Sequence, residues 1–254
     1  MNPRPTNSHS AYTHLADGRI GLRRLRAGDG LTVLCFPHAG GQSLGFRELA
    51  AQLGRGLAVY AIDPPGHGWA SGPPSESIEE VVAMYRAHLP PALLGGVLLG
   101  HSMGGYVALT LAAALSAPPH AVVVGATRPP CRRTDYTALS ELGDDALRAT
   151  LDDPQSPHAS LFEQFRDLVR ADLRAFDRFT APGAPLRSPL LAVGGLDDPL
   201  CRAEHMFDWR DHAADATVDL LAGGHFFVQS NARAYALSIQ RFLAMLDIRR
   251  DCHR

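Results

Sequence analysis

The 254-residue sequence contains no lysine, and all 24 of its cationic side chains are arginine. Without lysine the chain cannot form a Schiff base, which excludes pyridoxal-phosphate chemistry. It also cannot build a P-loop, whose lysine reaches the nucleotide phosphates. The formal net charge is only −2, so the charge balance gives no electrostatic reason to expect nucleic acid or an anionic membrane as a partner.

Cysteines and long apolar runs are also scarce. The four cysteines, Cys35, Cys131, Cys201 and Cys252, form no C-x-x-C pair, which predicts neither a disulfide framework nor a metal site. The most apolar stretch, residues 103–117, is about 15 residues long, which is short for a membrane span and typical of a buried helix. The polar N-terminus lacks the apolar segment of a signal peptide. We therefore expect a cytoplasmic protein with reduced thiols.

Short apolar runs alternate with helical patterns along the chain. Runs rich in Val, Leu and Ile without polar alternation are typical of strands buried on both faces of a parallel sheet; they lie at Leu31–Phe36, Leu57–Ile62, Val97–Gly100, Ala121–Gly125, Leu190–Gly194 and Thr217–Leu221. Candidate helices lie near 43–54, 76–89, 103–116, 203–213 and 231–246. This order predicts a mostly parallel, doubly wound α/β sheet, with an antiparallel edge strand at Ile20–Leu25. We expect a single domain over residues 1–254, with residues 1–15 and 249–254 disordered.

A segment of roughly 60 residues, about 128–187, interrupts this alternation. It begins and ends in proline-rich sequence, and its interior has apolar residues at helical spacing: Leu161, Phe165, Leu168, Val169, Leu173 and Phe176. Because the segment is too long for a simple crossover, we interpret it as a helical lid over the strand ends, with a pair of ordinary surface helices as the alternative. Arg166, Arg170 and Arg174 are interleaved with Asp167 and Asp172, a spacing that suits pairing on a helix surface.

The sequence Gly100-His101-Ser102-Met103-Gly104 matches the G-x-S-x-G pattern. It follows the apolar run that starts at Val97 and opens the apolar helix predicted from Met103. This strand–turn–helix context is what a nucleophile elbow requires, because the sharp turn exposes the serine hydroxyl. Ser102 is therefore the candidate nucleophile.

A serine hydroxyl needs a base, and the base needs an acid that orients it. His225 follows the last predicted strand and precedes the last predicted helix, and it is the preferred base over His205 and His212. The acid is expected in the loop after the strand at Leu190–Gly194. Asp197 and Asp198 compete there; we prefer Asp198.

Two backbone N–H groups are needed to bind the oxyanion. One is expected from Met103, the residue after the nucleophile, and the other from the loop Phe36-Pro37-His38-Ala39-Gly40-Gly41, with Ala39 as the candidate donor. No chemical role is assigned to His38, His67 or His101, for which structural hydrogen bonding is expected. Taken alone, these residues predict a serine hydrolase.

Together with Pro64-Pro65-Gly66-His67-Gly68, Gly194-Gly195-Leu196-Asp197-Asp198 and Gly223-Gly224-His225-Phe226-Phe227, these motifs resemble those of the type II thioesterases. That family consists of free-standing α/β-hydrolases that serve nonribosomal peptide and polyketide synthases. The resemblance covers roughly residues 30–246, and in similar proteins the second aspartate of the double-aspartate loop belongs to the triad, which favours Asp198.

The resemblance implies that the chain removes aberrant or stalled acyl groups from the phosphopantetheine arm of carrier proteins. It implies no resident cofactor, since the arm belongs to the substrate, and transient acyl or peptidyl carrier protein domains as partners of a monomer. Arginines of the lid segment could contact an acidic carrier, namely Arg132, Arg133, Arg148, Arg166, Arg170, Arg174 and Arg178. The catalytic residues alone also fit a small-ester esterase or lipase, or an acyltransferase, and a hydrolase fold used as a binding module is a further alternative.

Overall fold

The computed structural model describes residues 11–151 and 162–252. It contains one eight-stranded sheet in the order β1-β2-β4-β3-β5-β6-β7-β8. The strands are β1 (Tyr12–Leu15), β2 (Ile20–Arg26), β3 (Thr32–Phe36), β4 (Ala58–Asp63), β5 (Val97–His101), β6 (Ala121–Gly125), β7 (Leu190–Gly195) and β8 (Ala216–Leu221). The six neighbouring strands β4, β3, β5, β6, β7 and β8 pair in parallel, whereas β1 pairs with β2, and β2 with β4, in the antiparallel sense. The predicted mostly parallel sheet is therefore confirmed.

Helices cover the sheet and its ends. The α-helices are α1 (Arg47–Gln52), α2 (Ile78–His88), α3 (Pro91–Leu94), α4 (Met103–Ala114), α5 (Asp144–Leu151), α6 (Phe162–Asp177), α7 (Phe227–Ser230) and α8 (Ala232–Cys252). Shorter 3-10 segments are η1 (Ser43–Phe46), η2 (Pro130–Asp135), η3 (Leu139–Glu141) and η5 (Ala203–Asp211). The segment predicted as a helix at 203–213 is thus a 3-10 helix, with i to i−3 bonds at His205 and His212 and with Met206 and Trp209 buried three residues apart.

Both chain ends depart from the predicted disorder. The prediction for residues 12–15 is wrong, because they pair with β2 as β1, and Tyr12 donates a hydrogen bond of 2.7 Å to the buried Asp63. The strand at Ile20–Leu25 is antiparallel as predicted, but β1 covers it and forms the edge. Residues 249–252 are not frayed either: they continue α8, and Arg249 pairs with Asp215. Residues 1–10 and 253–254 lie outside the described residues.

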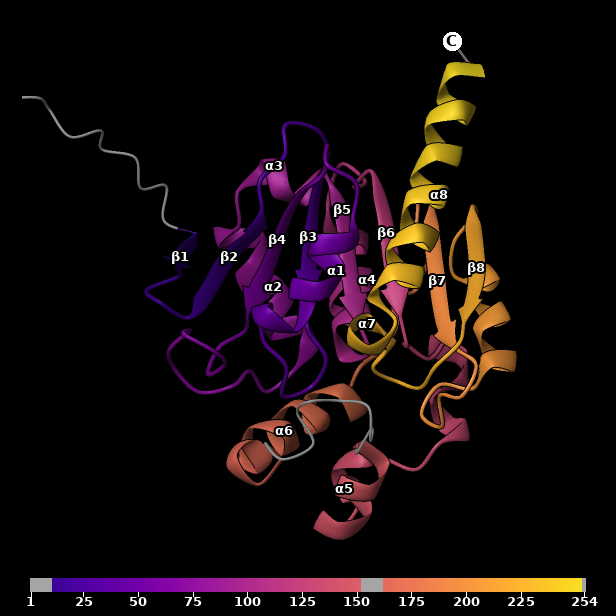
Figure 1. Cartoon of the computed structure of the whole chain (residues 1–254). Coiled ribbons are helices and arrows are strands. Elements are labelled where there is room, and N and C mark those ends of the chain that lie inside the picture. The colour runs from indigo at the N-terminus through magenta and orange to yellow at the C-terminus, as the bar shows by residue number, and fades with distance from the viewer. Residues whose placement is uncertain (1–10, 152–161, 253–254) are drawn as a thin grey trace, which may run out of the picture.

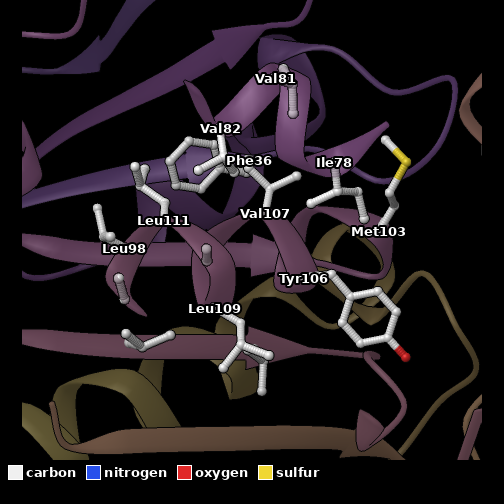
Figure 2. Packing of buried hydrophobic residues seen from close by; sticks show 14 of the residues in the cluster. Phe36, Ile78, Val81, Val82, Leu98, Met103, Tyr106, Val107, Leu109 and Leu111 are labelled. Atoms are coloured by element: carbon white, nitrogen blue, oxygen red, sulfur yellow. The ribbon is translucent and has the colours of Figure 1, made fainter. Parts of the chain in front are cut away.

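Each face of the sheet has its own core. Along β3, Val33 and Cys35 point into a cluster with α1 and α8, whereas Leu34 and Phe36 point into a cluster with α2 and α4 on the opposite face. Figure 2 shows the second cluster, where Val107 of α4 packs among residues of α2. Burial on both faces explains why the central strands carry apolar residues at consecutive positions.

The segment between β6 and β7 lies at one end of the sheet, and its buried apolar residues join the core cluster that contains α2 and α4. Its helices α5 and α6 sit beyond the carboxyl ends of the strands (Figure 1), where ligands bind in open α/β sheets. Residues 152–161 of this segment, including Leu161, lie outside the described residues. Among the described residues, no helix has both the length and the apolar character that a membrane crossing demands.

Candidate active site

Ser102 occupies a strained turn between β5 and α4. Its backbone has φ 53° and ψ −119°, a conformation that L-residues rarely adopt and that costs on the order of 1–3 kcal/mol. The turn is held in place because the Ser102 N–H donates a hydrogen bond of 2.8 Å to the Gly125 carbonyl at the end of β6. This sharp turn between strand and helix presents the serine hydroxyl at the carboxyl edge of the sheet.

The glycines of the motif make this turn sterically feasible. A Cβ on Gly100 would lie 1.9 Å from the Gly104 carbonyl oxygen, and a Cβ on Gly104 would lie 2.1 Å from the Phe36 carbonyl oxygen. Any side chain at either position would therefore force β5, α4 and β3 apart. The spacing of the motif follows from the close contact between these three elements.

His225 and Asp198 meet Ser102 from two other loops. The Nε2 atom of His225 lies 3.0 Å from Ser102 Oγ, and its Nδ1 atom lies 2.8 Å from Asp198 Oδ2. Asp198 follows β7, and His225 lies between β8 and α7. The fold thus brings together three side chains in the relative positions of nucleophile, base and orienting acid.

The acid loop distinguishes its two aspartates by burial. The side chain of Asp198 is fully buried, and its Oδ1 atom accepts hydrogen bonds from the N–H groups of Leu200 and Cys201, at 2.8 and 3.0 Å. Asp197 is exposed. The structure therefore places Asp198, and not Asp197, against His225.

His101 supports His225 from behind. Its ring is fully buried, and Nε2 donates a hydrogen bond of 2.8 Å to the His225 carbonyl oxygen. Burial lowers the pKa of His101 well below its ordinary value, and the nearby imidazoles of His225 and His38 lower it further. A neutral His101 fixes the backbone of His225 without placing a positive charge beside it.

The loop after β3 contributes backbone donors. The Gly41 N–H bonds the His38 carbonyl oxygen at 2.8 Å, and the Gly40 N–H bonds Asp172 Oδ2 at 2.7 Å. The N–H groups of Gly40 and Gly41 are therefore engaged within the protein. Ala39 and Met103 line the same pocket as Ser102 and His225, whose apolar wall is formed by Leu139, Leu173, Phe176, Leu200 and Phe226.

Asp172 is the site residue that sequence reasoning missed. The prediction of surface pairing with arginines is confirmed for Asp167, whose Oδ1 atom lies 3.5 Å from Arg166 Nε. It is wrong for Asp172, which is buried and whose Oδ2 atom lies 2.9 Å from His67 Nε2. A signal was present in the sequence: Asp172 has helical spacing with Val169 and Phe176, so it lies on the apolar face of α6. A carboxylate at such a position calls for a buried partner.

Of the arginines at 166–178 in the segment between β6 and β7, two pair with a carboxylate of α5, and two pair with none that the structure describes. Arg166 and Arg170 pair with Asp144 of α5, whereas Arg174 and Arg178 are exposed and have no carboxylate partner among the described residues. No set of three or more His, Cys, Asp or Glu side chains within residues 11–151 and 162–252 is placed to hold a metal ion.

Both the sequence and the fold of this chain are similar to those of known thioesterases. A family model described as "Thioesterase domain" matches residues 31–243. Thioesterase PikA5 of Streptomyces venezuelae is 26% identical over 90% of this chain and 84% of its own. Among solved structures, a thioesterase of the prodiginine pathway in Streptomyces coelicolor, RedJ, is 30% identical, with 84% of this chain and 86% of that chain covered and a TM-score of 0.71. The type II thioesterase BorB from the borrelidin biosynthetic cluster is 29% identical, with coverages of 87% and 97% and a TM-score of 0.73.

Proposed function

Since the chain belongs to the thioesterase family and is a hydrolase of thioester bonds, we propose that Ser102, His225 and Asp198 form its catalytic triad. The single observation that carries this proposal is the continuous hydrogen-bonded series from Ser102 Oγ through both nitrogens of His225 to Asp198. Asp198 keeps the Nδ1–H tautomer of His225, which leaves Nε2 free to accept the serine proton.

The reaction proceeds in two halves. His225 Nε2 takes the proton from Ser102 Oγ as the oxygen attacks the thioester carbonyl, and the collapsing intermediate releases the thiol with that proton. Water then attacks the acyl-serine, with His225 again as the base, and the free acid leaves. Each half passes through a tetrahedral intermediate whose negative oxygen must be stabilised.

The Ala39 and Met103 N–H groups form the oxyanion hole in this proposal. Both residues line the pocket at Ser102, and Met103 is the first residue of α4, where backbone N–H groups have no acceptor within the helix. Loss of one such donor typically costs ~10²–10³ in kcat.

The proposed substrate is an acyl group on the phosphopantetheine arm of an acyl or peptidyl carrier protein. Similarity to BorB and RedJ, which belong to biosynthetic pathways, supports this class, and removal of aberrant or stalled acyl groups is the proposed purpose. The arm belongs to the substrate, so no resident cofactor is part of the proposal. The chain would act as a monomer in the cytoplasm, and α5 and α6 would form a lid against which the carrier docks transiently.

The test is intact-protein mass spectrometry of an acetyl-phosphopantetheinyl carrier protein, incubated with wild-type protein or with Ser102→Ala. We expect loss of the acetyl mass with wild type, and a rate lower by several powers of ten with Ser102→Ala, as in other serine hydrolases, where the loss reaches about 10⁶. Persistence of the acetyl group with wild type, combined with cleavage of a simple ester, would instead support the esterase alternative.

A further inference from the structure

We propose that Asp172 is a positioning residue for the oxyanion hole, because it holds the loop of Ala39 in place while α6 is seated on the site. This inference rests on the proposed function, in which the Ala39 N–H binds the oxyanion. It adds a role for the lid helix: α6 completes the catalytic machinery in addition to covering the pocket.

Asp172 Oδ2 joins two segments that are distant in sequence. It accepts the Gly40 N–H at 2.7 Å and lies 2.9 Å from His67 Nε2. Both Asp172 and His67 are buried, so water cannot replace either contact at low cost. The carboxylate is therefore held at one position between the loop after β3 and the loop after β4.

His67 is oriented as a double donor. Its Nδ1 atom lies 3.0 Å from the Pro65 carbonyl oxygen, and its Nε2 atom faces the Asp172 carboxylate. Because both neighbours accept hydrogen bonds, the imidazolium is the form that satisfies them together. An ionised Asp172 paired with His67 also makes the bond to Gly40 charge-assisted, which strengthens it.

The peptide unit that follows Ala39 is clamped at both ends. Its N–H, that of Gly40, donates to Asp172, and its carbonyl oxygen, that of Ala39, accepts from His38 Nδ1 at 2.9 Å. Once this unit is fixed, rotation about the Ala39 backbone is restricted, which keeps the Ala39 N–H directed at the pocket. The contact thus acts on the oxyanion hole through the backbone, one residue away.

The same helix packs directly on this backbone. Gly40 has φ +73°, and a Cβ added to it would lie 2.4 Å from Val169 Cγ2 of α6. Further along α6, Leu173 and Phe176 form part of the pocket wall around Ser102. The packing of α6 on the loop after β3 therefore both completes the apolar wall of the pocket and fixes the backbone next to Ala39.

The test compares Asp172→Ala and Asp172→Asn with Asp167→Ala as the matched control. Asp167 lies on the same helix, but its side chain is 94% exposed. Two probes separate the roles: an alkyl boronic acid, whose adduct with Ser102 places an oxygen in the oxyanion hole, and an unreactive thioether of the same alkyl length, which fills only the pocket. For turnover, kcat and KM are measured with a small-molecule acetyl thioester.

We expect Asp172→Ala to lower kcat and weaken boronate binding by ~10-fold or more, below the ~10²–10³ for outright loss of a donor. KM and thioether binding should stay near the wild-type values. Asp172→Asn retains an acceptor for the Gly40 N–H and should recover part of the loss, and Asp167→Ala should behave as wild type.

If Asp172→Ala weakened the binding of the boronic acid and of the thioether equally, Asp172 would merely support the pocket. If boronate binding did not change, Asp172 would contribute nothing to the oxyanion hole. Either result overturns the proposal. Should Asp172→Ala fail to fold, the two probes are applied to Asp172→Asn and His67→Gln, which weaken the contacts of the carboxylate without removing the acceptor of the Gly40 N–H. Both variants should lose more affinity for the boronate than for the thioether, and equal losses would overturn the proposal. Boronate binding needs no carrier protein, so a wild type that binds boronate at Ser102 but leaves carrier-bound acetyl intact would refute the substrate and not this inference. A wild type that binds no boronate would refute both.

Discussion

Replacement of Asp198 by asparagine tests most directly whether this carboxylate fixes the tautomer of His225. Asp198 Oδ1 accepts two backbone N–H groups, from Leu200 and Cys201, while Oδ2 faces His225 Nδ1. In Asp198→Asn the amide oxygen takes the place of Oδ1, because only an oxygen can accept those two bonds. The NH₂ group then points at Nδ1 and donates to it.

This substitution forces the wrong tautomer on His225. With Nδ1 acting as an acceptor, the ring proton moves to Nε2, which lies 3.0 Å from Ser102 Oγ and can no longer take the serine proton. The equivalent change in a serine protease lowers kcat about 10⁴-fold, which corresponds to about 5 kcal/mol of transition-state stabilisation. We expect a loss of that order here.

The assay is hydrolysis of the acetyl carrier protein at saturating substrate, with thermal unfolding measured in parallel. Asp197→Asn is the matched control, since the residue is adjacent, exposed and changed in the same way. It should retain near-wild-type kcat. Asp198→Asn should unfold close to the wild-type temperature, because both loop hydrogen bonds are kept, whereas Asp198→Ala leaves two buried N–H groups unpaired at about 1–3 kcal/mol each.

Two results would refute this reasoning. If Asp198→Asn kept kcat within about tenfold of wild type, the tautomer argument would fail, because the wrong tautomer costs far more than that. If Asp197→Asn lost as much activity as Asp198→Asn, the loop would hold a different acid from the one the hydrogen bonds indicate.

Three further predictions concern the rest of the fold. Gly104→Ala should lower the free energy of unfolding by more than about 3 kcal/mol in urea denaturation, because its Cβ would lie 2.1 Å from a carbonyl oxygen of β3; Gly143→Ala, where the Cβ meets nothing within 4 Å, should not. Burial tends to lower the pKa of His67, but its hydrogen bond and charge pairing with the carboxylate on α6 outweigh burial and raise it above 6.5. The stabilisation from this pair is therefore complete below pH 6.5 and is lost as pH rises through the raised pKa, so the stability difference between wild type and His67→Gln should shrink over that range. Reversing the exposed charges of Arg174 and Arg178 to glutamate should raise KM for an acyl carrier protein several-fold and leave KM for a small thioester unchanged; an equal rise for both substrates would contradict the docking role.

The parts of the site that could be predicted from sequence are those fixed by short-range geometry. Ser102 could be identified because the elbow needs glycines two residues before and after it, and the structure shows backbone atoms in contact at both positions. His225 could be selected as the candidate base because it follows the last predicted strand and precedes the last predicted helix. For both residues, the position in the fold follows from the motif itself or from the order of neighbouring strands and helices.

Features that depend on burial or on pairing in the folded chain could not be predicted as clearly from the sequence. Spacing leaves Asp197 and Asp198 nearly equivalent, and only the folded loop shows which carboxylate turns inward to meet Leu200 and Cys201. Similarly, the short segment at Tyr12 has little strand character of its own, and it becomes a strand because β2 offers an unpaired edge and Asp63 offers an acceptor. Pairing energy of this kind is absent from local sequence patterns.

Asp172 shows why a long-range contact can remain hidden in a sequence whose motifs are clear. A distance of 105 residues separates it from His67, and among arginines it looks like an ordinary partner in surface ion pairs. The decisive feature is the helix face that it shares with Val169 and Phe176, since a carboxylate there is stable only if the opposing surface supplies donors. That surface is the loop of Gly40, next to the proposed oxyanion donor. The position of one charged residue on an apolar helix face therefore links α6 to the loop after β3. The difference between boronate and thioether binding in the Asp172 variants measures how much this link serves the proposed oxyanion hole.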